Sequence, residues 1–261
     1  MTVSIVLSTY NWPGALKLVL ESIMLQSQLP NEIIIADDGS SFDTTKLIRH
    51  YISTSSIPIH HIYHEDNGFR KSIILNKAII TAKSKYILQV DGDCILHKHF
   101  IKDHVQFIKP HTFVHGSRVF LSQNLTNKLI INKESRVLFS LFEMTNLFNA
   151  LYLPMLSFLF DTSNKKMSGT RGCNFAFMRQ DFININGYNE DIVGWGREDT
   201  ELSLRLMNNN IQKRRLKLSG IMYHLNHPLS SKTTLDKNIE ILNNTIINNV
   251  TFCKNGCDKY I

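Results

Sequence analysis

The feature that most constrains the fold is a repeated order of short apolar runs, each followed by a polar cluster and then by a helical pattern. Val3–Ser8 and Glu32–Ala36 are the first two such runs, and Tyr86–Val90 is a later one. Short apolar runs bounded by polar clusters are typical of buried strands. Because strands that alternate with helices form a parallel sheet covered on its faces, we expect an α/β fold.

Other expected elements follow the same alternation. Helical patterns are expected over Leu16–Gln28, around Leu47–Ile48 and over Ile74–Ala82, and further strands around Ile57–Tyr63 and Thr112–Leu121. Open α/β sheets bind their ligands at the carboxyl ends of the strands. The polar clusters that follow the apolar runs are therefore expected to lie at a binding site.

Composition excludes several other classes of protein. The 261 residues are 43% hydrophobic and 20% charged, with 12 Gly and 6 Pro, which excludes collagen-like, disordered and low-complexity chains. Four cysteines are too few for a disulfide scaffold. Cys253 and Cys257 leave a zinc site or a disulfide open, but free thiols are the preferred interpretation. The first residues resemble no signal peptide or anchor, so a cytoplasmic location is expected.

The positive charge is unevenly distributed. The chain has a net charge of +7, yet residues 1–70 hold 4 Lys or Arg against 7 Asp or Glu, and residues 71–261 hold 25 against 15. A basic chain invites an anionic partner. No nucleic-acid partner is expected, because no recognisable nucleic-acid-binding module is present. The basic cluster over 213–217 is interpreted as a solvated edge or as a contact to diphosphate or anionic lipid.

The segment Val137–Phe160 is long and apolar enough to suggest a transmembrane span, since its 24 residues carry one charge, Glu143. Polar residues recur at every third position from Ser140 to Asn149, and Pro154 interrupts the run. These features favour an amphipathic helix instead, either packed on the core or lying on a membrane surface.

Asp91-Gly92-Asp93 is the strongest candidate for a metal site. Two carboxylates one residue apart at a strand end can converge on one hard cation, and oxygen ligands suit Mg²⁺ or Mn²⁺. The same three residues also occur in plain turns, so the spacing needs support from its context.

That context is a resemblance to the family 2 glycosyltransferases, which have the GT-A fold. Four motifs carry it in the same order and spacing: Ser8-Thr9-Tyr10-Asn11, Asp37-Asp38-Gly39-Ser40, Asn67-Gly68-Phe69-Arg70 and Asp91-Gly92-Asp93. The resemblance implies an α/β GT-A fold with a mostly parallel central sheet flanked by helices. It also implies one compact domain, with a donor-binding half over residues 1–110 and an acceptor-binding, catalytic half over residues 111–261.

The resemblance implies a UDP-sugar donor and assigns residues to it. Ser8 and Tyr10 would form the base pocket, and Asp38 would accept a hydrogen bond from the uracil imide. Arg70 would contact the nucleotide or its phosphates. A turn or N-cap role stays open for Asp37 and Asp38.

The implied cofactor is Mn²⁺ or Mg²⁺. Asp93 would bind it, and relatives place a histidine ligand where this chain has His224, with His227 as a competitor for the role. Many relatives have an acidic pair where Gln89 and Val90 precede Asp91 here. Asp91 is therefore assigned either to the metal or to the ribose of the nucleotide sugar.

A second signature lies at Trp195-Gly196-Arg197-Glu198-Asp199, before a helical pattern. It resembles the acceptor-side motif of β-1,4-galactosyltransferases and bacterial chondroitin-type polymerases. The resemblance makes Asp199 the general base and Glu198 a residue that holds the acceptor sugar. Trp195 would offer its ring face to that sugar. Capping of the helix by its acidic first turn, and an ordinary buried role for Trp195, are the structural alternatives.

Two further residues are assigned to the acceptor pocket. The segment Ser168–Phe177 resembles the loop and strand that shape this pocket in the same enzymes, which implicates Gly172 and Asn174. Arg197 stands where some galactosyltransferases have Gly, which bears on the choice of donor or acceptor.

The resemblance as a whole implies an inverting, metal-dependent hexosyltransferase. It would move a hexose or N-acetylhexosamine, such as galactose, N-acetylgalactosamine or glucose, to a lipopolysaccharide, capsule or related bacterial surface glycan, in some cases linked to a lipid. Peripheral contact with the inner membrane stays open, and oligomeric state is not indicated. Two alternatives remain: a sugar nucleotidylyltransferase, although its Gly-rich loop with Arg is missing, and a non-catalytic glycan- or nucleic-acid-binding protein.

Overall fold

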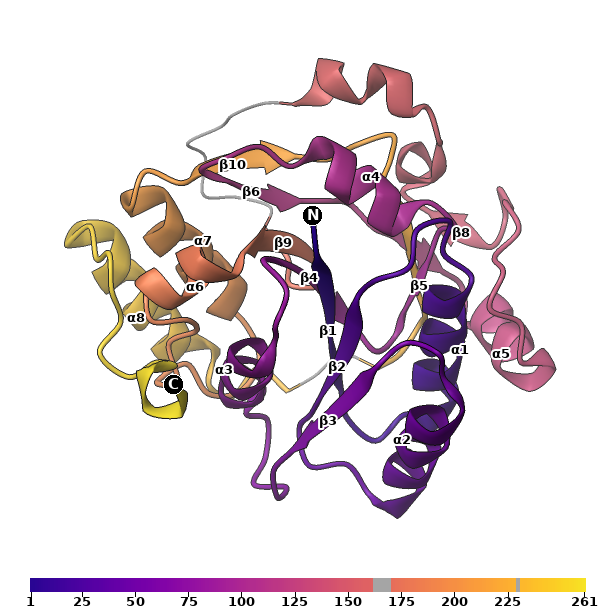
Figure 1. Ribbon diagram of the computed structural model, residues 1–261, viewed down its shortest axis with the longest axis horizontal. Coiled ribbons are helices and arrows are strands. Elements are labelled where there is room, and N and C mark those ends of the chain that lie inside the picture. The colour runs from indigo at the N-terminus through magenta and orange to yellow at the C-terminus, as the bar shows by residue number, and fades with distance from the viewer. Residues whose placement is uncertain (162–169, 229–230) are drawn as a thin grey trace.

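Two β-sheets form the frame of the molecule, whose computed structural model describes residues 1–161, 170–228 and 231–261 (Figure 1). The larger sheet has seven strands in the order β10-β6-β9-β4-β1-β2-β3. They are β1 (Val3–Thr9), β2 (Glu32–Asp37), β3 (Ile59–Tyr63), β4 (Tyr86–Asp91), β6 (Thr112–His115), β9 (Asn174–Met178) and β10 (Gln212–Arg215). Neighbouring strands are parallel except that β9 is antiparallel to β4 and β6. The predicted mostly parallel α/β sheet is confirmed.

Helices cover both faces of this sheet. The helices that pack on it are α1 (Pro13–Met24), α2 (Phe42–Thr54), α3 (Lys71–Thr81), α4 (Phe100–Phe107), α6 (Arg179–Asn184) and α7 (Glu198–Asn208). The others are α5 (Gln123–Asn132), which packs on the second sheet, α8 (Leu235–Ile247), which packs against α7, and the short 3₁₀ turn η3 (Asp258–Tyr260). Successive strand residues point to opposite faces, so Ile5 packs in one core with α1, α2 and α4, and Val6 in another with α3, α6 and α7. Burial on both faces explains why β1 is a continuous apolar run.

A second sheet has four strands in the order β5-β11-β7-β8. They are β5 (Cys94–Leu96), β7 (Val119–Leu121), β8 (Met144–Thr145) and β11 (Met222–His224). This sheet packs against α1 and α5 in a third apolar cluster. The prediction of a single strand around Thr112–Leu121 is wrong, because the chain leaves the large sheet after β6 and enters the small sheet at β7. The turn between them lies at Gly116, where a Cβ would come within 2.2 Å of the Asn174 side chain.

The prediction of an amphipathic helix over 137–160 is also wrong. After β8, Asn146 takes a left-handed conformation with φ of +59°, and the chain continues as two 3₁₀ turns, η1 (Leu147–Ala150) and η2 (Pro154–Phe160). Pro154 begins η2, where its missing N–H costs no helical hydrogen bond, and it prevents a continuous helix across the segment. Among the described residues, no helix combines the length and the apolar character that crossing a membrane requires.

Much of this segment is exposed instead. Figure 1 shows η2, just before the grey trace of residues 162–169, at the outer edge of the molecule. We call its exposed large apolar side chains the apolar surface: Leu138, Phe139, Leu141, Phe142, Phe148, Leu151, Leu153, Met155, Leu156, Phe158 and Leu159.

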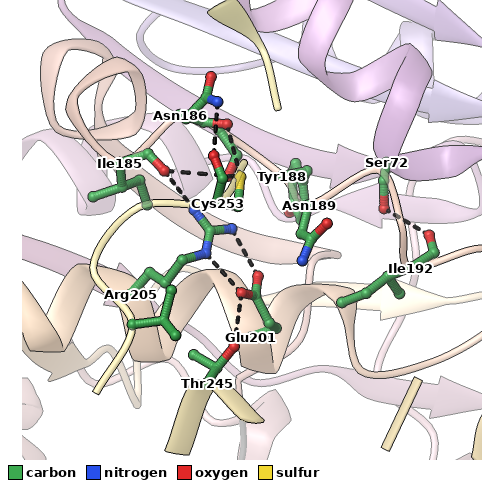
Figure 2. Close-up of polar contacts among 12 residues, drawn as sticks. Ser72, Ile185, Asn186, Tyr188, Asn189, Ile192, Glu201, Arg205, Thr245 and Cys253 are labelled. Atoms are coloured by element: carbon green, nitrogen blue, oxygen red, sulfur yellow. Dashed lines mark hydrogen bonds and ion pairs between the residues drawn. The ribbon is translucent and has the colours of Figure 1, made fainter. Parts of the chain in front are cut away.

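The four cysteines are buried and form no disulfide, which excludes the disulfide considered for Cys253 and Cys257. The Cys253 thiol donates to the carbonyl of Asn186 at 3.2 Å, and the Asn186 side chain donates to the carbonyl of Cys253 at 2.8 Å (Figure 2). These bonds attach the C-terminal tail to the loop that follows α6.

A buried ion pair holds α7 in place (Figure 2). The guanidinium of Arg205 donates to both carboxylate oxygens of Glu201, each at 2.7 Å, and to the carbonyl of Ile185 at 2.6 Å. Thr245 of α8 donates to the same carboxylate at 3.2 Å. Helices α7 and α8 and the end of α6 therefore meet at one charged pair inside the protein.

We expect Glu201→Ala to lower the free energy of unfolding by about 3–5 kcal/mol, because it leaves the buried guanidinium without its counter-charge. Urea denaturation followed by circular dichroism measures this loss. The matched control is Glu240→Ala on exposed α8 surface, for which a change within about 0.5 kcal/mol is expected. A Glu201→Ala variant as stable as the control would show that the pair contributes nothing to stability.

Candidate active site

Two adjoining cavities open where β1, β2 and β4 end. The larger cavity is about 590 Å³ and the smaller about 420 Å³. Both are lined by the same five residues at their junction: Phe69, Lys71, Asp91, Arg118 and Trp195. The larger cavity receives the loops after β1 and β2, and the smaller receives the start of α7. Motifs from distant parts of the chain thus meet in one continuous space.

Asp38 lies in the wall of the larger cavity, and both of its carboxylate oxygens are bonded. His64 pairs with one oxygen at 2.6 Å, and the amide of Arg70 donates to the other at 2.9 Å. Burial raises the pKa of Asp38 although His64 opposes the shift. Asp37, in contrast, is fully buried and accepts from the amide of Ser40 at 2.9 Å, which is the turn role considered for this pair.

Ser8 and Tyr10 also line the larger cavity. The Ser8 hydroxyl donates to Asp91 at 2.8 Å, and the Tyr10 hydroxyl donates to Asp66 at 2.9 Å. The ring of Tyr10 stands at the mouth of the cavity, since this residue is 52% exposed. Gly39, with φ of +93°, lets the loop after β2 approach the loop after β3, because a Cβ at position 39 would lie 2.5 Å from the Cα of Asp66.

Arg70 differs from its expectation. Its guanidinium donates to the carbonyl of Glu65, and in the part of the chain that the structure describes Arg70 lines neither cavity. Its contribution to the site is its backbone amide, which holds Asp38. The reason is local: Arg70 is the residue before α3, so its amide turns toward the loop after β2 while its side chain lies over its own loop.

Sequence reasoning missed Lys71, the next residue. Its ammonium lies 2.6 Å from Asp91 Oδ1. Burial opposes the charged lysine, but Asp91, Asp199 and Glu198 outweigh burial and raise its pKa. Asp91 is thus held by Lys71 and by Ser8, which faces it across the β1–β4 pairing. The signal in the sequence was a lysine immediately after the Gly-Phe-Arg motif.

Asp93, His224 and His227 form the candidate metal centre. Their ligand atoms all lie within 4.8 Å of one another. His227 Nε2 is 3.1 Å and His224 Nε2 is 3.6 Å from Asp93 Oδ2. One carboxylate oxygen and two imidazole nitrogens can converge on a single ion, and this donor set suits Mn²⁺. Both candidate histidines therefore belong to the cluster, while Asp91 lies outside it.

The small sheet builds this cluster. β11 pairs antiparallel with β5 so that His224 lies opposite Cys94, next to Asp93. The amide of Leu225 donates to the Asp93 carbonyl at 2.9 Å, which brings the chain toward His227. Burial disfavours the Asp93 anion, but hydrogen bonding from His227 and the charges of both histidines lower its pKa to about 2. Asp93 is therefore an anion at neutral pH, ready to face a cation.

Glu198 and Asp199 begin α7 at the wall of the smaller cavity. The amide of Gly172 donates to Asp199 Oδ2 at 2.6 Å, and the Tyr188 hydroxyl donates to Oδ1 at 3.0 Å. Only glycine allows the first contact, because a Cβ at position 172 would lie 2.5 Å from the carboxylate. Among the described residues, Glu198 Oε2 is buried without a hydrogen-bond partner.

The two carboxyl groups influence each other's charge. Burial and the neighbouring Asp199 raise the pKa of Glu198 to about 7, while Lys71 opposes the shift. Burial also raises the pKa of Asp199, again against Lys71. Raised pKa values in a cleft are typical of groups that exchange protons in catalysis. Because the pKa of Glu198 lies near neutral pH, this carboxyl group can hold or release a proton there.

Trp195 lies at the junction of the two cavities and is 39% exposed. The amide of Gly194 donates to the carbonyl of Phe69 at 3.0 Å, which joins the loop of Trp195 to the loop before α3. Arg197 has φ of +81°, a left-handed backbone region that favours glycine.

Asn174 does not lie where it was expected. It is fully buried; its amide donates to the carbonyls of Ser117 at 2.9 Å and Gly220 at 3.0 Å, and its oxygen pairs with His104 at 2.9 Å. With all these atoms engaged, Asn174 joins the two sheets behind the cavity instead of facing an acceptor. Ser168 and Gly169 of the same motif lie outside the described residues.

The chain matches the models of two known protein families. The family model described as glycosyl transferase family 2 matches residues 4–185. A second model, described as the N-terminal domain of galactosyltransferase, matches residues 160–228. The first spans the donor-side motifs, and the second spans the Trp195–Asp199 signature and both histidines of the cluster.

Two curated relatives resemble most of the chain. The hyaluronan synthase of Pasteurella multocida is 26% identical over 220 residues, which are 78% of this chain and 22% of the relative. The chondroitin synthase of Escherichia coli is 24% identical over 247 residues, which are 86% of this chain and 35% of the relative. The chain therefore spans only about a fifth to a third of the length of these relatives.

Solved structures share the fold. S. aureus TarS 1–349 in complex with UDP-GlcNAc has a TM-score of 0.63 at 16% identity, over 95% of this chain and 67% of that one. The mannosyltransferase PcManGT from Pyrobaculum calidifontis, in complex with GDP-Man and Mn²⁺, has a TM-score of 0.60 at 16% identity, over 85% of this chain and 56% of that one.

Proposed function

This chain belongs to glycosyl transferase family 2 and has the GT-A fold, and from that premise we propose that it is an inverting glycosyltransferase that uses a UDP-sugar. The observation that carries the proposal is the junction of the two cavities. The larger cavity has a cluster of metal-ligand type, and the smaller has a pair of carboxyl groups with raised pKa values. A donor in one cavity and an acceptor in the other would meet at Lys71 and Asp91.

The nucleoside is assigned to the larger cavity. Tyr10 offers an exposed ring at its mouth for the uracil face, and Asp38 has a carboxylate in its wall for the uracil imide. Ser8 and Asp91 are bonded to each other in the wall of the cavity, and the cluster of metal-ligand type does not include Asp91, so we assign Asp91 to the ribose. The complex of TarS with UDP-GlcNAc supports a uridine nucleotide as the ligand.

Asp93, His224 and His227 would hold a divalent cation. Their oxygen–nitrogen donor set favours Mn²⁺, with Mg²⁺ as the second choice, and the Mn²⁺ complex of PcManGT supports a metal in this fold. Such an ion supplies positive charge that neutralises the diphosphate as it leaves.

Asp199 is proposed as the general base of transfer. It takes the proton of the acceptor hydroxyl as that oxygen bonds to C1 of the sugar. The bond between C1 and the diphosphate oxygen breaks, and its electron pair leaves with UDP, so attack from the opposite side inverts C1. Glu198 has a buried oxygen free to bind the acceptor, and the ring of Trp195 offers it an apolar face.

The acceptor is proposed to be a growing bacterial surface glycan, such as lipopolysaccharide or capsule, carried on a lipid at the cytoplasmic face of the inner membrane. The apolar surface supports a membrane contact, because patches of this kind mark interaction sites. Exposed Lys133 and Arg136 precede it, and the ammonium of Lys217 lies 4.4 Å from the ring of Phe148. Cations beside exposed apolar rings complement an anionic lipid surface.

The membrane contact predicts that the full chain co-sediments with vesicles of phosphatidylglycerol and phosphatidylcholine. Phe142→Ser combined with Met155→Ser should weaken this binding at least about tenfold, because both side chains are strongly exposed. Phe42→Ser, on exposed α2 surface, is the matched control and should bind as the parent does. Equal vesicle binding by the parent, the double variant and Phe42→Ser would refute the membrane contact. If the parent is a dimer in solution and the double variant a monomer, the apolar surface contacts a second copy of the chain instead.

The transferase itself is tested by incubating the chain with UDP-galactose, UDP-N-acetylgalactosamine, UDP-glucose and UDP-N-acetylglucosamine, with and without Mn²⁺ or Mg²⁺. We expect release of UDP from at least one donor only when the metal is present, since water can attack C1 in place of the acceptor hydroxyl and the leaving diphosphate needs the charge of the metal. The proposal fails if no nucleotide sugar binds or turns over under any of these conditions.

A further inference from the structure

Arg118 lies between β6 and β7 and lines both cavities at their junction. Its backbone is fixed, because Asn149 donates to its carbonyl at 3.0 Å and Asn174 donates to the carbonyl of Ser117 at 2.9 Å. The residue is therefore presented to the cavity from a rigid connection between the two sheets.

The guanidinium of Arg118 lies close to the candidate metal centre. Its central carbon is 4.6 Å from the ring centroid of Phe120. The same ring also contacts His224, at 5.4 Å between centroids, because β7 and β11 pair in parallel with Phe120 beside His224. Arg118 and one histidine of the metal cluster thus contact the same aromatic ring.

This cation lacks a counter-charge within the described residues. No carboxylate lies within ion-pair distance, Nε is buried without a partner, and Nη1 donates only to the thiol of Cys173 at 3.6 Å. Lys71 and Arg205 differ, since each is paired with a carboxylate. A guanidinium has five donors, and leaving them unpaired in a partly buried site is unfavourable. The contact with Phe120 is favourable but satisfies none of the five.

The site itself indicates which anion would pair with Arg118. The smaller cavity contains Glu198 and Asp199, so a second anion there would be repelled. Arg118 also lines the larger cavity next to the metal cluster, where the proposed donor has its phosphates. We propose that Arg118 binds the diphosphate of the nucleotide donor and stays bonded to it in the UDP product. This inference rests on the proposed function.

Two properties follow from this arrangement. Arginine binds phosphate oxygens through two parallel charge-assisted bonds, which lysine cannot reproduce. The residue should therefore distinguish ligands by their phosphates and leave the recognition of uridine to the loops after β1 and β2. Arg118 would also stabilise the charge that develops on the diphosphate when the sugar leaves, so its loss should slow donor cleavage as well as weaken UDP binding.

The test is calorimetric titration of the full chain, in Mn²⁺, with UDP and with uridine. Arg118→Gln should weaken UDP binding about 10- to 100-fold, the effect of losing charge-assisted bonds, and should leave uridine binding unchanged. Arg118→Lys should fall between the parent and Arg118→Gln. Arg136→Gln removes an exposed arginine outside both cavities and should bind UDP as the parent does.

Three results would overturn the inference. UDP binding by Arg118→Gln equal to that of the parent would remove Arg118 from the diphosphate. A matching loss of uridine and UDP affinity in a variant that melts at the parental temperature would make Arg118 a structural residue of the pocket. Failure of the parent itself to bind UDP would reject the donor assignment first, which separates that failure from one confined to Arg118.

Discussion

Replacing Asp199 with Asn should lower the rate of sugar transfer by about 10²–10⁴-fold, the usual contribution of a general base. The amide oxygen of Asn can still accept from Gly172, and its NH₂ group can donate to the hydroxyl oxygen of Tyr188, so the local structure should survive the change. The amide cannot take the proton of the acceptor hydroxyl. Because Asp199 lines only the smaller cavity, UDP binding in the larger cavity should stay nearly unchanged. Rates measured at saturating donor and UDP titrations of the same variant separate these two effects.

The pH dependence of transfer gives a second check on Asp199. The base acts only when ionised, so activity should fall as the pH drops through its pKa. Burial raises that pKa, and the fall should therefore begin at a higher pH than for an ordinary aspartate. Asp236→Asn, in the exposed first turn of α8, is the matched control and should retain parental rates. Normal transfer by Asp199→Asn would assign the base to another residue.

Removing the metal should be the other large effect. Chelation, or Asp93→Asn, should lower the turnover of the donor at least about 100-fold, because several kcal/mol of charge stabilisation would be lost. Asp93 is the only carboxylate in the cluster with His224 and His227 among the described residues. An amide at this position is neutral and a weaker ligand. Added Mn²⁺ should restore the chelated parent but not the variant.

Direct measurement of the metal makes this prediction specific. Titration with Mn²⁺ should give one site in the parent and a much weaker one in Asp93→Asn. His224→Ala and His227→Ala should each weaken Mn²⁺ binding as well, since a ring nitrogen of each histidine lies in the same cluster. If only one does, the other histidine has a different role. Full activity after thorough chelation would contradict the proposal of a metal-dependent enzyme.

Much of the donor side could be predicted because its motifs lie at the ends of parallel strands. Ser8, Asp38 and Asp91 each end or follow a strand, and parallel pairing in register brings such positions to one edge of a sheet. The position of Glu198 and Asp199 could be predicted as well, since their place at the start of a helix is a local property. The assignment of these residues to donor and acceptor remains a prediction.

Most of the errors concern contacts between distant parts of the chain, and the one over 137–160 has a local cause. The small sheet joins β5, β7, β8 and β11, which are far apart in the chain, so neither the break between β6 and β7 nor the meeting of both histidines with Asp93 has a local signal. The polar pattern over 137–160 suggested a helix, but Pro154 and a left-handed Asn146 divide the segment. Asn174 was assigned to the pocket from its neighbours in the sequence. Its burial could not be foreseen, because it depends on three distant partners.

The sequence by itself determined the order of strands and helices from β1 to β4, the polar motifs that end these strands and the family to which the chain is related. These depend on local periodicity and on residues close to one another in the chain. Only the tertiary structure decided that Asp91 pairs with Lys71, that Asp93 meets both histidines, and that no carboxylate of the described residues pairs with Arg118. Such partners are set by the pairing of distant strands, and whether a charged group is paired depends on that packing.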